Sequence, residues 1–286
     1  MIPKPQAFAA IFLAMLPLMA QAEGGRLLGT GGATQVEGAA GGGLVPWAVL
    51  AGYGTREQNG GTAFYTRVDT GDYALDAAGV AWTFANRLEL SLAHQRLDLG
   101  PLQQQLSLPM AMLQQDVFGA KLRLGGDVVF TAWPQLSLGV QHKRLRDDAL
   151  PMAVGARDGA GTDVYLSASK LFLNGGGGNQ ILVNATFRYT GANQLGLLGH
   201  GGDRGRRSLV WEGSAAWLPD PSWAVGLEYR QKPDQLAFAV EDDAMDAFVA
   251  WFPNKHATVV AAWVDLGSIA GRDGQRGGYL SLQLTH

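Results

Sequence analysis

Apolar and polar residues alternate with a period of two in several segments of the chain. In residues 87–98, RLELSLAHQRLD, leucines at 88, 90 and 92 alternate with polar or small residues. Residues 134–145, 179–189 and 223–230 show the same pattern. Because successive side chains of a β-strand point to opposite faces, these segments are predicted to be strands. The alternation alone also fits a soluble sandwich, whose strands are half buried.

The connections between these segments distinguish a membrane barrel from a sandwich. Short connections are expected near residues 85–86, 133–134, 174–178, 219–222 and 253–255. Longer polar connections alternate with them, at residues 99–113, 146–161, 191–206, 233–244 and 268–276. Outer-membrane barrels have this asymmetry, with short periplasmic turns and longer extracellular loops. The sequence therefore predicts an all-β fold, a transmembrane antiparallel β-barrel.

Large aromatic residues gather at the short connections, as expected for rings that favour the membrane interface. This predicted interfacial girdle contains Trp82, Phe84, Trp133, Phe172, Trp217, Trp223, Trp251 and Phe252.

Composition supports export and a membrane environment. Charged residues make up only 16% of the chain and there are 40 glycines and no cysteine, whereas soluble domains usually carry about a quarter charged residues. Residues 1–22 combine Lys4, an apolar stretch too short to span a bilayer and the triplet Ala20-Gln21-Ala22, which predicts a signal peptide. Residues 23–286 are then expected to form one barrel domain in the cell outer membrane.

The number of strands depends on the glycine-rich start of the mature chain. If the last strand ends in the periplasm, counting backwards makes residues 44–54 a descending strand and residues 33–38 an ascending one. That count gives fourteen strands, which we favour within a range of twelve to fourteen; twelve result if the start lies inside the barrel. Residues 23–43 are accordingly either a flexible lead-in or an inward-folded plug, because glycine allows close backbone packing.

Charged residues on the lumen side of the predicted strands are candidates for a solute-contacting lining or for a salt-bridged filling. These lumen-lining candidates are Glu89, Lys121, Arg123, Arg188, Glu212, Glu228, Arg230 and Lys232. On the lipid side, near the long loops, candidates for contact with lipopolysaccharide phosphates are Arg96, Arg144 and Arg146. A solvated strand end is the alternative for this second set.

No catalytic, cofactor-binding or metal-binding residues are predicted. Ser91 and His94 should point to opposite faces of one strand, and no serine is matched to His200 near Asp203. The five histidines lack metal-ligand spacing, and Gly175–Gly178 lack the Lys-Ser/Thr of a phosphate loop. A formal net charge of −3 gives no general basic surface for nucleic acid.

The last residues, GGYLSLQLTH, are predicted to form the closing strand of the barrel, because an open edge in lipid leaves backbone groups unsatisfied. Leu280, Leu282 and Leu284 should face lipid, Tyr279 the lumen, and His286 the membrane interface. The strand resembles the C-terminal signal that barrel-assembly machinery recognises, although that signal usually ends in an aromatic residue such as phenylalanine.

Several strings together resemble a family of proteobacterial proteins of unknown function, domain of unknown function 3034. They are EGAAGGGLVPWAVLAGYGT from Glu37, FRYTGANQLGLLGHGGD from Phe187, EYRQKPDQL from Glu228, FVAWFPNK from Phe248 and the closing GGYLSLQLTH. The resemblance implies an outer-membrane barrel over the mature chain and supplies no activity or catalytic residues. The leading functional hypothesis is a passive pore for small solutes. The alternatives are a closed barrel whose loops bind a partner or lipopolysaccharide and, more distantly, a lipid-modifying enzyme.

Overall fold

The computed structural model describes residues 26–105, 110–175 and 178–286. Within these ranges, twelve strands form a closed antiparallel barrel and two short strands form a separate hairpin. The barrel strands are β3 (Gly60–Thr70), β4 (Ala74–Phe84), β5 (Leu88–Asp98), β6 (Met112–Gly125), β7 (Gln135–Leu145), β8 (Ala160–Phe172), β9 (Gln180–Thr190), β10 (Ser208–Asp220), β11 (Trp223–Arg230), β12 (Ala244–Asn254), β13 (Ala257–Asp265) and β14 (Arg276–Thr285). The predicted signal peptide lies outside the described residues.

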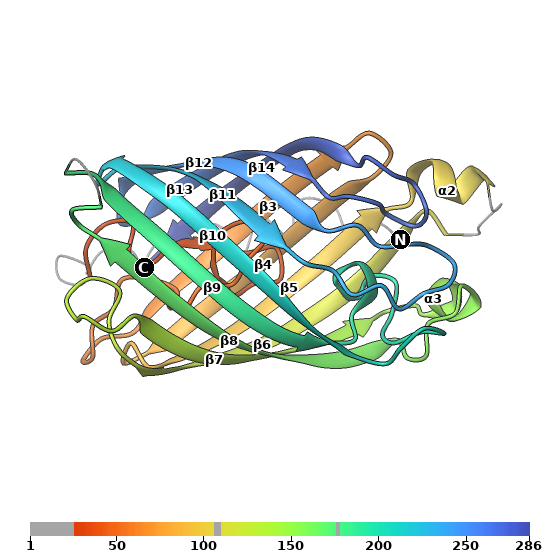
Figure 1. The fold of residues 1–286 in the computed structure, drawn as a ribbon, viewed down its shortest axis with the longest axis horizontal. Helices are drawn as coiled ribbons and strands as arrows, with labels where there is room; N and C mark the ends of the chain where they lie inside the picture. Colours follow the sequence, from red (N-terminus) through yellow and green to blue (C-terminus); the bar gives the residue numbers. More distant parts are fainter. Residues whose placement is uncertain (1–25, 106–109, 176–177) are drawn as a thin grey trace.

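The barrel closes between its first and last wall strands, as predicted from the C-terminal residues. β14 pairs with β3 from Gly277 to Thr285, with Leu282 opposite Tyr65. Every neighbouring pair is antiparallel and follows the chain order (Figure 1). No wall strand is left with a free edge, which is the condition for a sheet to lie in lipid.

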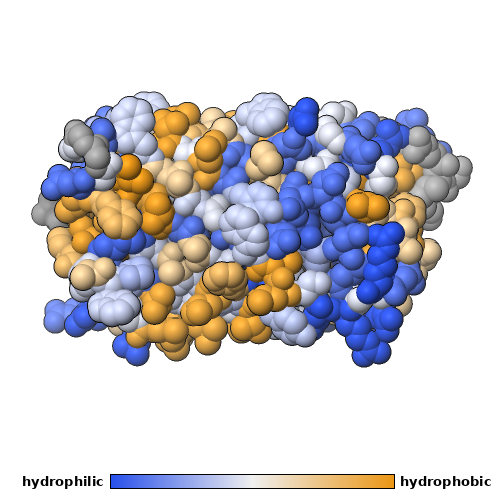
Figure 2. Space-filling view, in the orientation of Figure 1, coloured by the Kyte–Doolittle hydropathy of each residue, from blue (hydrophilic) through white to orange (hydrophobic). Residues whose placement is uncertain are grey.

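The two faces of the wall differ as the alternation predicts. In β5, Leu90 and Leu92 are each 45% exposed, whereas the alternating Glu89 is 1% exposed. Figure 2 shows apolar side chains covering much of the barrel surface toward the left and polar ones gathering toward the right, the end that carries α2 (Gly100–Gln105) and α3 (Ala149–Ala153). None of the described helices is long and apolar enough to cross a membrane.

The favoured count of fourteen strands is wrong, and twelve is the number of wall strands in the described part of the chain. Residues 44–54 do not join the wall, and residues 33–38 contribute only Ala33–Thr34 (β1), which pairs with Ala40–Gly41 (β2). In residues 44–50, LVPWAVL, apolar residues occupy odd and even positions alike, and all seven are buried. A wall strand, by contrast, presents every second side chain to lipid. Pro46 also lacks the N–H that an interior strand needs.

Connections at the two barrel ends follow the predicted asymmetry with two exceptions. The β4–β5, β10–β11 and β12–β13 turns are tight, while residues 99–111, 146–159, 191–207, 231–243 and 266–275 connect strands at the other end. The β6–β7 connection at the short-turn end is longer, and the β3–β4 turn at the long-loop end is short.

Trp217, Trp223 and Trp251 face outward at the short-turn end, but Phe252 is only 4% exposed and faces the lumen. Its assignment to the girdle is wrong because Trp251 holds the outward position.

Candidate functional site: a lumen closed by an internal segment

Residues 31–53, here called the plug, lie inside the barrel. The reddish trace in Figure 1 runs within the barrel toward its short-turn end. Nearly every plug residue is buried, and inward-facing side chains from several wall strands bond to its backbone. The plug fits in the lumen because many of its residues are small. A side chain at position 42 would collide with the wall, since a Cβ on Gly42 would lie 1.9 Å from Oε1 of Glu228. Gly38 turns the hairpin between β1 and β2 with φ of 95°.

The plug's only acidic residue, Glu37, lies in a layer of buried charges (the charged layer: Glu37, Lys143, Asp163, Arg188, Glu212 and Arg230). Arg230 donates to both Glu37 carboxylate oxygens, at 2.9 and 3.1 Å. Lys143 bonds the same carboxylate and also Asp163, at 2.8 Å. Arg188 lies 3.7 Å from Glu37. The six side chains are at most 5% exposed. Such buried charges require partners, because removing a charge from water without one is costly.

A second charged pair holds two separate parts of the plug backbone. Glu89 accepts N–H groups from Ala40 and Ala51, at 3.2 and 2.8 Å. Lys121 donates to the carbonyls of Ala40 and Val49, at 2.7 and 2.9 Å, and lies 3.3 Å from Glu89. The pair therefore ties β2 to the returning chain.

Glu228 fixes the middle of the plug. Its carboxylate accepts the Leu44 N–H at 2.7 Å and the Trp47 indole N–H at 3.3 Å. Ser214 also donates to it at 2.7 Å. Asp246, its neighbour on the facing strand, is 4% exposed, and neither of its oxygens has a partner within the described part of the chain.

Neutral side chains bind the segment that returns toward the short-turn end. Gln135 and Ser137 both donate to the Ala48 carbonyl at 2.6 Å. Ser169 accepts the Ala48 N–H at 2.8 Å, and Thr186 donates to the Pro46 carbonyl at 2.8 Å. Backbone groups of the plug are therefore hydrogen-bonded to wall side chains instead of to a neighbouring strand.

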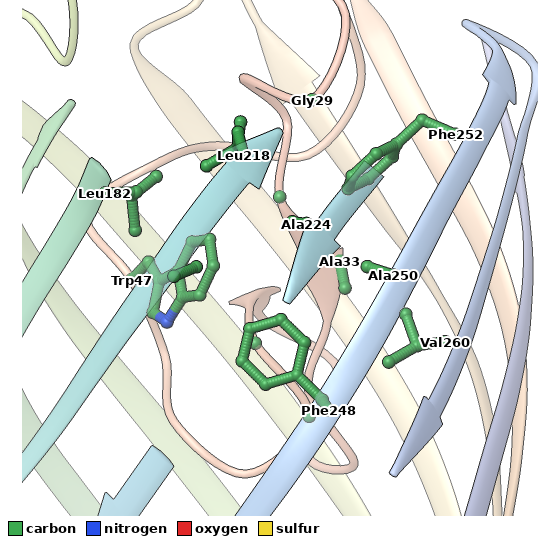
Figure 3. A pocket seen from close by; sticks show the side chains of 14 residues that line it. Gly29, Ala33, Trp47, Leu182, Leu218, Ala224, Phe248, Ala250, Phe252 and Val260 are labelled. Atoms are coloured by element: carbon green, nitrogen blue, oxygen red, sulfur yellow. The ribbon is translucent and has the colours of Figure 1, made fainter. Parts of the chain in front are cut away.

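The plug also has an apolar seat, formed by Trp47 and Ala33 against inward-facing wall residues. The wall residues are Leu182, Ala216, Leu218, Ala224, Phe248, Ala250, Phe252 and Val260, and Figure 3 shows them converging on Trp47 and Ala33. They leave a cavity of about 20 Å³, space for about one water molecule.

The eight lumen-lining candidates all belong to the inward register, and their contacts are with the plug, with one another, with other wall residues and with the loops. Glu89, Lys121, Glu228 and Arg230 contact the plug directly, and Glu212 bonds Arg188. Arg123 binds Asp127 at 3.0 Å, and Lys232 binds Glu241 at 3.1 Å, outside the strands. Contact between these residues and a solute stays a prediction.

Sequence reasoning missed Glu37, Lys143 and Asp163. The signal for Lys143 was present, since it has the inward parity of β7 between the outward His142 and Arg144. Asp163 likewise has the inward parity of β8. Glu37 had no local signal, because its charged partners lie at least 106 positions away along the chain.

The second candidate set lies on the outer surface of the long-loop half. Arg146 makes two bonds of 3.0 Å to Asp116, which also contacts the His94 ring at 2.7 Å. Arg146 is 56% exposed, Arg144 is exposed, and Arg96 is partly exposed. Contact with lipopolysaccharide stays a prediction. Ser91 faces inward while His94 faces outward, as expected from their spacing.

Loop residues cover the long-loop mouth of the lumen. Gln194, in a short 3-10 helix (η2, Asn193–Gly196), donates to Glu241 at 2.6 Å and to the Ser268 carbonyl at 2.7 Å. His200 is buried in the same loop, and neither ring nitrogen has a partner in the described residues. Burial and nearby Lys143 lower the pKa of His200 to about 4. We call residues 191–207 the cap.

No group of three or more His, Cys, Asp or Glu side chains in the described ranges is arranged to hold a metal ion.

The closed twelve-stranded wall with a lipid-compatible outer face defines a transmembrane β-barrel protein. The chain belongs to the family described as protein of unknown function DUF3034, whose model matches residues 30–283. No curated protein matches the sequence.

Solved structures with distant similarity include the KdgM porin, with 10% identity, a TM-score of 0.47 and coverage of 79% of this chain and 98% of that one. The NanC porin has 10% identity, a TM-score of 0.43, and coverage of 79% and 98%. The Acinetobacter baumannii outer-membrane protein Omp33 has 10% identity, a TM-score of 0.41, and coverage of 79% and 95%.

Proposed function

We propose that the protein is a pore for small solutes in the outer membrane, with the plug closing its lumen in the observed state. The observation that carries this proposal is the polar inner wall. Glu89, Lys121 and Glu228 are anchored on wall strands and bind largely plug groups or one another, and Arg188 binds Glu212 and Gln141 of the wall. Water can satisfy the same groups once the plug moves, so the lumen suits an aqueous path.

Barrel size supports the same proposal. About eight strands suffice for side chains alone to fill a barrel, and wider barrels enclose space. The twelve wall strands described here enclose a whole hairpin segment. A purely structural barrel would not need this extra width.

The second candidate is a closed barrel that binds a partner or lipopolysaccharide from outside. The buried plug and the cap favour it, since both obstruct the lumen. The outward arginines, including exposed Arg146, would supply forked donors for lipopolysaccharide phosphates. In either case the signal peptide and the barrel-assembly machinery would deliver the chain to the outer membrane.

Recording from purified, refolded protein in planar bilayers tests the pore, together with solute-driven swelling of liposomes. If the protein is a pore, we expect brief channel openings without additive. We expect the channel to be open for a larger fraction of the time in moderate urea, because urea loosens the plug before it unfolds the wall. Absence of conductance and swelling at every urea concentration that leaves the folded gel mobility intact would favour the closed barrel.

A further inference from the structure

The charged layer contains a group of three cations around one carboxylate that belongs to the plug. Lys143, Arg188 and Arg230 come from β7, β9 and β11, and all three face Glu37. Gln35 adds a neutral donor at 2.6 Å. The wall thus provides ammonium and guanidinium donors that converge on a single carboxylate, and the Arg230 fork matches the two oxygens of that group.

Charge balance shows what the site would prefer without Glu37. The layer holds three cations and three carboxylates, of which Asp163 and Glu212 remain on the wall when the plug leaves. The wall alone therefore carries a formal charge of about +1, in a lumen where charge is poorly screened by protein. An anion restores the balance, whereas a cation increases the imbalance.

We propose that Lys143, Arg188 and Arg230 form a binding site for small carboxylate anions, and that Glu37 occupies it as a tethered ligand in the closed state. The part of this proposal that concerns permeation rests on the proposed pore. A carboxylate solute takes the place of Glu37, and this exchange releases the plug. Because Glu37 is tethered, its effective concentration is high, so the free anion is needed at millimolar levels.

Wall residues hold Lys143 and Arg188 in place independently of Glu37. Arg188 is held by Glu212 and by Gln141, at 2.7 Å, and its guanidinium lies 5.1 Å from the Tyr165 ring centroid. Lys143 is held by Asp163. Because these contacts involve only wall residues, they preserve the site when Glu37 is absent.

Chemical rescue of Glu37→Ala tests the site without depending on conductance. The substitution leaves a space that acetate can fill, and bound acetate stabilises the folded state by linkage. The assay measures the temperature at which detergent-refolded protein loses its folded gel mobility. We expect about 100 mM sodium acetate to raise it by roughly 3–5 °C relative to sodium chloride, and acetamide to leave it unchanged. The same substitution at exposed Glu57 is the control and should show no acetate effect.

Conductance separates the two proposals. If acetate stabilises Glu37→Ala and neither this variant nor the natural sequence conducts, the anion site stands and the pore fails. If the variants conduct but acetate and acetamide act alike, the pore stands and the anion site is wrong. Should Glu37→Ala not fold even in acetate, Glu37→Gln decides by its reversal potential in a salt gradient. A shift toward anions supports the site, and unchanged selectivity overturns it.

Discussion

The plug is held by two regions of the lumen that use different chemistry. At the charged layer, Glu37 meets Lys143 and Arg230 in bonds of defined direction. At the apolar seat, Trp47 and Ala33 contact aliphatic and aromatic side chains around a small cavity (Figure 3). The two regions should respond differently to change. Removing one member of a buried ion pair leaves the other uncompensated, whereas an apolar contact weakens in proportion to the atoms removed.

Removing the carboxylate at the charged layer should have the largest effect. Glu37→Ala should reduce the free energy of plug opening by roughly 3–5 kcal/mol, because buried cations lose their partner. Hydrogen exchange of the plug amides should then accelerate by roughly 10²–10⁴-fold in chloride buffer. Glu57→Ala should leave these rates unchanged. If the plug amides exchange equally slowly in Glu37→Ala and in the natural sequence, the charged layer does not hold the plug.

Removing the indole from the apolar seat should have a somewhat smaller effect. Trp47→Ala should reduce the free energy of plug opening by about 3 kcal/mol, because apolar burial is lost and a cavity remains. Trp47→Phe keeps most of the apolar contact and loses the indole N–H that donates to Ser214 at 2.8 Å, so it should cost about 1 kcal/mol. Urea-dependent exchange of the plug amides measures both values. A larger loss in Trp47→Ala than in Glu37→Ala would reverse the ranking of the two regions.

Acid should loosen the cap over the charged layer and leave the apolar seat unaffected. The pKa of His200 falls from 6.5 to about 4 on folding, so the neutral ring stabilises the cap above pH 6.5. This contribution is lost as pH falls from 6.5 toward 4, and linkage gives a loss of about 2 kcal/mol at pH 5. Lys143 and Arg207 oppose protonation, while Asp163 and Asp158 favour it.

Hydrogen exchange of the cap at pH 7.5 and pH 5, corrected for intrinsic rates, measures this loss. His200→Gln should abolish the pH dependence, and His142→Gln, on the outer surface, should retain it. A cap that stays equally protected at both pH values would contradict the role of His200.

The smallest effect is expected at the chain terminus. The His286 ring stacks on Trp82 with centroids 6.2 Å apart, so a phenylalanine ring can take its place at the β3–β14 seam. His286→Phe should change stability by no more than about 0.5 kcal/mol and leave assembly equal or better. The yield of heat-modifiable barrel in outer-membrane fractions checks this. A lower yield would mean that the imidazole itself is needed.

The wall was predictable from sequence because each strand carries its own signal. Alternation placed Leu90 outside and Glu89 inside, and the same rule puts Arg188 and Arg230 on the lumen side. The plug was not uniquely predictable. Residues 44–54 are apolar enough to resemble a strand, and only their burial on both sides shows otherwise. Glu37 could not be recognised, since its role depends on three cations brought together by closure of the barrel.

A reversible lock on the plug tests the central claim most directly. A Cβ on Gly38 would lie 3.1 Å from the Ala93 Cβ, so the two positions need to move apart by only a few tenths of an ångström to reach the spacing of a disulfide, and the natural chain has no cysteine. Single-channel recording of Gly38→Cys/Ala93→Cys should give openings under reducing conditions and none after oxidation. Each single-cysteine variant should conduct in both conditions. Equal conductance of the reduced and the oxidised double variant would show that ions do not pass where the plug lies, and would contradict the account.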